Sequence, residues 1–148
     1  MRLYLEPSVL VKLFKKEDDS AKMLDIIEAI DRGTQWFACT SAWSPLEVAR
    51  ALRKDGKPKE LIELNLKELR RHNISFVDVT RVILRKSESV ISSRNIYASD
   101  ALHAATFHSV SRAKSLDGML SDDRHYDRLK NIVKVLTLKE ISLDTSVS

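Results

Sequence analysis

The amino-terminal stretch reads Leu3-Tyr4-Leu5-Glu6-Pro7-Ser8-Val9-Leu10-Val11-Lys12-Leu13-Phe14. Its short apolar run predicts a strand over residues 2–5, and the proline and longer apolar run that follow predict a helix over residues 7–15. Glu6 lies at the junction between the two. An acid at the carboxyl end of a strand occupies the edge at which an open α/β sheet usually binds its ligands.

Three more carboxylates, Glu47, Asp100 and Asp123, occupy similar junctions between predicted strands and helices or loops. Taken singly, Glu47 and Asp100 are explained by the first turn of a helix, where an acid complements the helix dipole. In a parallel sheet, however, all four acids project toward one edge. Carboxylates within about 6 Å of one another repel by roughly 3 kcal/mol per pair at an effective dielectric near 20. A bound Mg²⁺ or Mn²⁺, which prefers oxygen ligands, would offset this repulsion.

The rest of the chain alternates short apolar runs with longer amphipathic stretches, which is typical of α/β architecture. The helices expected around Glu47 and after it should form a hairpin. We expect one domain over residues 1–141 and a frayed tail over residues 142–148. The other strands are predicted near residues 36–40, 75–78, 117–120 and 132–136, and the other helices near residues 20–32, 43–55, 58–72, 79–93, 98–111 and 124–130.

The composition is that of an ordinary globular protein of 148 residues, with 43% hydrophobic and 31% charged side chains. The single cysteine, Cys39, can form no disulfide within the chain, which favours an intracellular protein. The first residues lack a signal-peptide pattern, and no stretch approaches the roughly 18 apolar residues of a membrane span. We therefore expect a cytoplasmic protein without membrane association.

Positive charge is concentrated in one part of the chain. The formal net charge is +4, and residues 48–72 carry twice as many basic as acidic side chains. A solvated helix face would explain these charges, and contact with nucleic-acid phosphates would explain them equally well. The candidates for phosphate contacts are Arg50, Arg53, Lys54 and Lys57.

Other chemistries find less support in the sequence. A lone cysteine supplies no thiolate cage for zinc, and three scattered glycines cannot form a phosphate-binding loop. His103, one helical turn after Asp100, is expected in the core or behind the site. No closely spaced zinc-binding pair is formed by the histidines, which are His72, His103, His108 and His125.

Four segments together resemble the motifs of PIN-domain proteins. The opening strand and helix around Glu6 are similar to the first motif. The third is the most specific, and in the fourth a hydroxyl residue stands two positions before an acid. The second, third and fourth segments read Ser41-Ala42-Trp43-Ser44-Pro45-Leu46-Glu47-Val48-Ala49-Arg50-Ala51-Leu52, Ile96-Tyr97-Ala98-Ser99-Asp100-Ala101-Leu102-His103-Ala104-Ala105 and Leu120-Ser121-Asp122-Asp123-Arg124.

The resemblance implies a three-layer α/β/α domain around a parallel sheet of about five strands in the order 3-2-1-4-5. It also implies a Mg²⁺- or Mn²⁺-dependent endoribonuclease that hydrolyses RNA phosphodiester bonds. The most similar group is the VapC toxins of toxin–antitoxin pairs, which form homodimers and are silenced by a cognate antitoxin. In the implied metal and catalytic site, Asp100 and Asp123 hold the ion together with Glu6, while Glu47 positions or deprotonates the attacking water.

The first motif departs from the PIN pattern, because its acid is typically Asp and here it is Glu6. The extra methylene moves the carboxylate outward by up to about 1.5 Å. At the fourth motif Asp122 and Asp123 compete for one role, and the spacing from Ser121 favours Asp123. Ser8, Ser121 and Asp122 are accessory candidates.

Two other interpretations remain open. A catalytically degenerate PIN domain that binds RNA or a protein partner would explain why Glu6 replaces the usual aspartate. A receiver-like phosphorylation domain would explain the adjacent Asp122 and Asp123, although the third predicted strand offers only Asp78 in place of the expected acid.

Overall fold

A computed structural model describes residues 1–33 and 35–143. Five strands form one parallel sheet in the order β3-β2-β1-β4-β5, so the predicted order 3-2-1-4-5 is confirmed. This strand order contradicts the receiver-like interpretation, because receiver domains have the strand order 2-1-3-4-5. The strands are β1 (Arg2–Leu5), β2 (Phe37–Ser41), β3 (Ser75–Val77), β4 (Gly118–Leu120) and β5 (Val135–Leu136).

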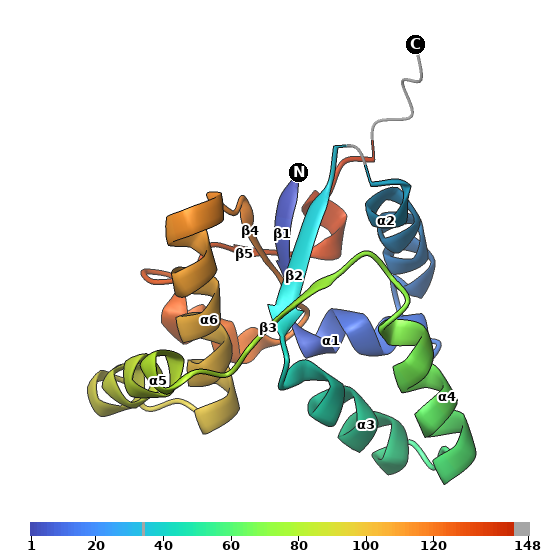
Figure 1. Cartoon of the computed structure of the whole chain (residues 1–148), viewed down its shortest axis with the longest axis horizontal. Helices are drawn as coiled ribbons and strands as arrows, with labels where there is room; N and C mark the ends of the chain where they lie inside the picture. The colour runs from blue at the N-terminus through green and yellow to red at the C-terminus, as the bar shows by residue number, and fades with distance from the viewer. Residues whose placement is uncertain (34, 144–148) are drawn as a thin grey trace.

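Helices cover both faces of the sheet, which gives the predicted three layers. α5 (Arg81–Ser93) and α6 (Ala98–Lys114) lie together on one face. The helices on the other face come from the first half of the chain, and α3 and α4 form the predicted hairpin (Figure 1). These helices are α1 (Pro7–Leu10), α2 (Ser20–Arg32), α3 (Ser44–Lys54) and α4 (Lys59–Leu69).

Alternation along β1 divides the interior into two cores. Leu3 and Leu5 pack with apolar residues of the helices from the first half of the chain, whereas Tyr4 points to the opposite face and packs with α6 residues such as Phe107. Successive side chains of a strand face opposite sides of the sheet, so a strand covered on both faces must be apolar throughout. This explains why β1 reads as an uninterrupted apolar run before Glu6.

Two predicted elements differ from those observed. Residues 124–130 do not form an α-helix but a 3₁₀ helix, η2 (Arg124–Leu129), in which Tyr126 and Leu129 are buried. Their spacing of three suits a 3₁₀ helix, because side chains three apart lie over one another there. The predicted strand over residues 132–136 shrinks to β5, because the N–H groups of Ile132 and Val133 bond to the carbonyl of Leu129 in a turn.

The ends of the remaining elements differ little from prediction. The helix expected over residues 7–15 is α1 followed by the 3₁₀ helix η1 (Val11–Leu13), and a further 3₁₀ helix, η3 (Leu138–Glu140), follows β5. Of the predicted frayed tail, Leu143 packs against the core, and residues 144–148 lie outside the described residues. Within the described ranges, no helix combines the length and the apolar character needed to span a membrane.

Candidate metal centre and its surroundings

The candidate metal centre lies at the carboxyl edge of the sheet, between the start of α6 and the loop after β4. Asp100 stands in the first turn of α6, and Asp123 is the N-cap of η2. The Nδ1 atom of His125 lies 3.2 Å from Asp123 Oδ1 and 3.6 Å from Asp100 Oδ2. One ligand atom from each of these three residues lies within 4.8 Å of the other two, which is close enough for one cation to contact all three.

The Asp100 carboxylate is buried, and its Oδ2 atom has no hydrogen-bond partner in the described part of the chain. Burial raises the pKa of Asp100 above its ordinary value, and the charge of Asp123 raises it further. A buried acceptor without a partner is costly, because it has given up its contacts with water. A divalent cation would satisfy this oxygen and offset the repulsion between the two carboxylates. The residues present therefore fit Mg²⁺ or Mn²⁺.

Glu6 lies at the end of β1, and its carboxylate is engaged in hydrogen bonds. Its Oε2 atom accepts from the N–H of Ser8 at 3.1 Å, from the Ser8 hydroxyl, and from Ser121 Oγ at 2.8 Å. Glu6 therefore caps α1. Burial raises the pKa of Glu6, and the hydrogen bonds from the two serines oppose that rise. Among the described residues, neither Glu6 nor Glu47 belongs to a group of three ligand atoms that lie mutually within 4.8 Å.

The accessory hydroxyls predicted from the sequence connect the loops that follow β1 and β4. Ser121 Oγ accepts a hydrogen bond from the N–H of Asp123 at 3.0 Å while it donates to Glu6. Ser8 Oγ accepts from the N–H of Asp122 at 2.8 Å. The backbone that carries the fourth-motif acids is thus fixed by side chains from the first motif.

Glu47 is held by a chain of two buried side chains. It stands in the first turn of α3, and its Oε1 atom lies 2.9 Å from Nε2 of His103. The Nδ1 atom of His103 lies 2.6 Å from the hydroxyl oxygen of Tyr4. Burial raises the pKa of Tyr4 well above its ordinary value, so the hydroxyl keeps its proton. When that hydroxyl donates to Nδ1, the Nε2–H group donates to Glu47. The expectation that His103 packs behind the site is confirmed.

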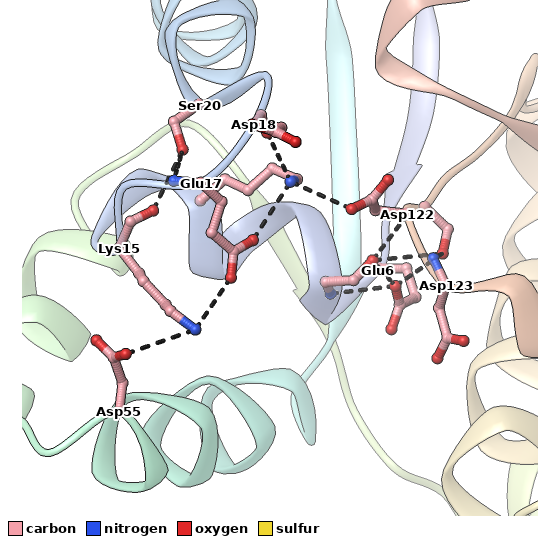
Figure 2. A network of polar contacts seen from close by, with 11 residues as sticks. Glu6, Lys15, Glu17, Asp18, Ser20, Asp55, Asp122 and Asp123 are labelled. Atoms are coloured by element: carbon pink, nitrogen blue, oxygen red, sulfur yellow. Dashed lines mark hydrogen bonds and ion pairs between the residues drawn. The ribbon is translucent and has the colours of Figure 1, made fainter.

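Asp122 is adjacent to Asp123 in sequence, but its carboxylate has a different partner (Figure 2). Its Oδ2 atom lies 3.2 Å from Nζ of Lys12, whose side chain is only 2% exposed. The same ammonium lies 3.3 Å from Glu17 Oε2 and donates to the carbonyl of Asp18 at 2.8 Å. The three N–H groups of the lysine therefore each have an acceptor, as a buried charge requires. Asp122 is tied to Lys12, whereas Asp123 faces Asp100.

The network extends from Lys12 to the far end of α3. Glu17 Oε1 lies 3.2 Å from Nζ of Lys15, and the same Nζ lies 3.6 Å from Asp55 Oδ1, just after the helix ends. Figure 2 shows these contacts as a continuous series from Asp55 to Asp122. Burial alone would lower the pKa of Lys12, but its contacts with Asp122 and Glu17 raise it, so the lysine is charged.

The four predicted basic residues differ in whether they lie beside Glu47. Arg50 and Lys54 line the same hollow as Glu47, because positions 47, 50 and 54 share one face of α3. Arg53 lines a different hollow between α3 and α4, which Arg50 also borders. Its guanidinium donates to the carbonyl of Lys57 at 3.4 Å. Only Arg50 and Lys54 therefore border a predicted catalytic acid.

Two residues of the site were not assigned by sequence analysis. His125 stands two residues after Asp123, and this short spacing is the only signal that would have placed it there. In the sequence, Lys12 is a single charged residue within an apolar helical segment, and nothing near it indicates a partner. Its burial depends on Asp122, more than a hundred residues away, so no local pattern predicts the contact.

The sheet order defines a three-layer α/β/α domain. Asp100, Asp123 and His125 form a candidate cation site at its switch point. Within this class, the family model described as PIN domain matches residues 3–132, and the chain belongs to this family. No curated protein sequence matches the chain significantly.

Three solved structures share the fold. The chain resembles VapBC2 from Rickettsia felis bound to promoter DNA, with a TM-score of 0.68, 15% identity and coverage of 93% of this chain and 98% of that one. A toxin–antitoxin complex from Klebsiella pneumoniae gives a TM-score of 0.61 at 16% identity, with coverage of 94% of this chain and 99% of that one. Mycobacterium tuberculosis VapC20, described as a sarcin–ricin loop cleaving toxin, gives a TM-score of 0.63 at 13% identity, with coverage of 84% of this chain and 92% of that one. At such identities the likeness establishes the fold.

The raised pKa of Asp100 predicts a pH-dependent effect of Asp100→Asn on stability. Without divalent ions, the folded state favours the protonated acid, so wild type loses stability as the pH rises through the carboxyl range. Asparagine stays neutral, and the variant should therefore become increasingly more stable than wild type between acidic and neutral pH. Thermal unfolding of both proteins across this range measures the difference.

Added Mn²⁺ should reverse the order of stability at neutral pH. A ligand at a hundredfold excess over its Kd stabilises a protein by about 2.7 kcal/mol, and the variant lacks a charged ligand. Asp127→Asn, which removes an exposed acid from η2, the 3₁₀ helix that follows Asp123, is the matched control and should respond to Mn²⁺ as wild type does. Equal stabilisation of wild type and Asp100→Asn would contradict a metal centre at Asp100.

Proposed function

We propose that the protein is a Mg²⁺- or Mn²⁺-dependent endoribonuclease that hydrolyses RNA phosphodiester bonds. The observation that carries the proposal is the buried Asp100 oxygen that lacks a described partner and lies beside Asp123 and His125. Membership of the PIN domain family and the likeness to a sarcin–ricin loop cleaving toxin support it. A bound divalent ion supplies positive charge to the scissile phosphate and lowers the pKa of the attacking water.

Each side chain has a separate task in the proposed reaction. Asp100 and Asp123 hold the ion, and Glu6 completes the acidic edge as a ligand, directly or through water. Glu47 accepts the proton of the attacking water, because its position is fixed by His103 and it is partly open to solvent. The hydrogen bonds that hold Glu6, Glu47 and the backbone of Asp123 preorganise the site before substrate binds.

We also propose that the protein is the toxin of a toxin–antitoxin pair, that it acts in the cytoplasm as a homodimer, and that a cognate antitoxin silences it. Two of the similar structures are described as a VapBC2 assembly and a toxin–antitoxin complex, which supports this proposal. A small neighbouring reading frame that encodes a DNA-binding protein would be the expected gene arrangement.

The alternative is a catalytically degenerate PIN domain that binds RNA or a protein partner. Glu6 favours this second candidate, because it replaces the aspartate typical of the family. Its carboxylate oxygen Oε2 is already occupied by hydrogen bonds from Ser8 and Ser121. The two candidates differ in whether the wild-type protein cleaves RNA.

Removal of the Asp100 carboxylate should abolish cleavage and leave the fold intact. Asp100→Asn is expected to lower Mn²⁺-dependent cleavage of labelled RNA by at least tenfold, because a charged ligand of the ion is lost. Asp127→Asn provides the matched control for charge and should cleave as wild type does. Undiminished cleavage by a folded Asp100→Asn protein would exclude this residue from the reaction.

Substitution of Glu6 separates the two candidate functions. If Glu6 is a working ligand, Glu6→Gln should lose at least tenfold in cleavage and bind Mn²⁺ more weakly, whereas Glu6→Asp should retain or increase both. Calorimetric Mn²⁺ titration beside the cleavage assay measures these effects. A degenerate domain would instead show no cleavage by wild type and a gain on Glu6→Asp. Strong cleavage that survives Glu6→Gln would mean that the remaining acids suffice.

The division of the basic residues predicts unequal contributions to RNA binding. Neutralising Arg50 and Lys54 together should weaken binding and reduce the slope of log K against log salt by about 1.4, since each phosphate contact on a single strand contributes about 0.7. The double variant Arg53→Gln/Lys57→Gln removes the same charge outside the Glu47 hollow and should change the slope less. Equal slopes for both double variants would show that the Glu47 hollow makes no special contact with phosphate.

A further inference from the structure

An exposed aromatic side chain lies directly beside the candidate metal centre. Tyr97 immediately precedes α6, three residues before Asp100, and is 67% exposed. Its ring lies 5.2 Å from the ring of His125, centroid to centroid, at an interplanar angle of 52°. His125 in turn lies close to both Asp100 and Asp123. Most of the surface of this ring is therefore open to contact with a ligand.

The ring borders a hollow that also contains a metal-centre acid and an arginine. The hollow has a volume of about 230 Å³ and is lined by Asn95, Ile96, Tyr97, Asp100, His125 and Arg128. Pockets that enclose a whole small molecule typically have about 300–1,000 Å³. This hollow is smaller, which suits one part of a longer ligand whose remainder stays outside.

Arg128 supplies a positive charge at the rim of the hollow. Its Nη1 atom donates to the carbonyl of Asn95 at 2.9 Å, which fixes the side chain against the loop before α6. The guanidinium has five N–H donors, and this hydrogen bond uses one of them. An exposed arginine fixed in this way presents its other donors to an anion, and phosphate oxygens match the planar guanidinium well.

We propose that Tyr97 and His125 form a stacking subsite for one nucleobase of single-stranded RNA, next to the scissile phosphate, and that Arg128 binds the adjoining phosphate. This proposal rests on the proposed ribonuclease function. Stacking of a base on an aromatic ring tolerates any base, because every base has a π face. The subsite would therefore select unpaired nucleotides without reading their sequence.

Binding of RNA with and without bases tests the subsite. The probes are a labelled single-stranded oligoribonucleotide and an abasic strand of equal length, measured by fluorescence anisotropy without divalent ions so that no cleavage occurs. Tyr97→Ala should weaken binding of the intact strand by about tenfold and leave the abasic strand unaffected. Tyr97→Phe keeps the ring and should bind as wild type does. Arg128→Gln should weaken binding of both strands, because it removes a phosphate contact.

Three results would overturn the subsite. The first is equal binding of the intact strand by wild type and Tyr97→Ala. The second is an equal loss on the intact and abasic strands. The third is a change of oligomeric state in sedimentation of Tyr97→Ala, because the ring would then serve a contact between copies of the chain. In each of these cases the proposed ribonuclease function stands if wild type still cleaves RNA, whereas a wild type that neither binds nor cleaves RNA overturns both proposals.

Discussion

The parallel pairing of β1 with β4 is the contact on which the site depends. Tyr4 lies opposite Met119 and Leu5 opposite Leu120, so both strands end at the same level. The N–H of Glu6 donates to the carbonyl of Leu120 at 3.0 Å, which continues the pairing one residue beyond β1. Since β1 and β4 flank the point where the strand order reverses, the loops after them diverge to opposite faces and leave room between them. A shift of one residue in this register would separate Glu6 from Ser121 and turn Tyr4 away from His103.

Charge at this edge is balanced by a different partner for each acid. Glu6 has serine hydroxyls, Glu47 has His103, and Asp122 has Lys12. Asp100 is the exception, because its buried Oδ2 atom has no hydrogen bond among the described residues. A bound cation would therefore stabilise the Asp100 carboxylate more than the acids that already have hydrogen-bond or ion-pair partners. Its neighbour Asp123 is held through its backbone N–H, which donates to Ser121, and through its Oδ1 atom, which accepts from the N–H of His125 at 2.9 Å.

The alternation of short apolar runs with longer amphipathic stretches predicted most elements, whereas the sheet order was implied by the resemblance to PIN-domain proteins. The sequence predicted an α-helix where the structure has the 3₁₀ helix η2. In a segment this short, buried residues three positions apart are compatible with either kind of helix. At the site, the motif spacing indicated Asp123 over Asp122, and the structure shows that the Asp122 carboxylate contacts Lys12, whereas the Asp123 carboxylate lies beside His125 and Asp100. Lys12 and Tyr97 could not be predicted, because burial of the first and exposure of the second depend on contacts between distant segments.

The Glu6 side chain connects the first motif to the fourth. Its Oε2 atom reaches Ser121 across the switch point and also caps α1 through Ser8. Ser121 accepts the N–H of Asp123 with the same oxygen that donates to Glu6. The first-motif acid therefore positions the fourth-motif acid through a single hydroxyl, whether or not it touches an ion itself. The arrangement depends on one side-chain oxygen at position 6 that accepts from both serines, and Oε2 of Glu6 is that oxygen here.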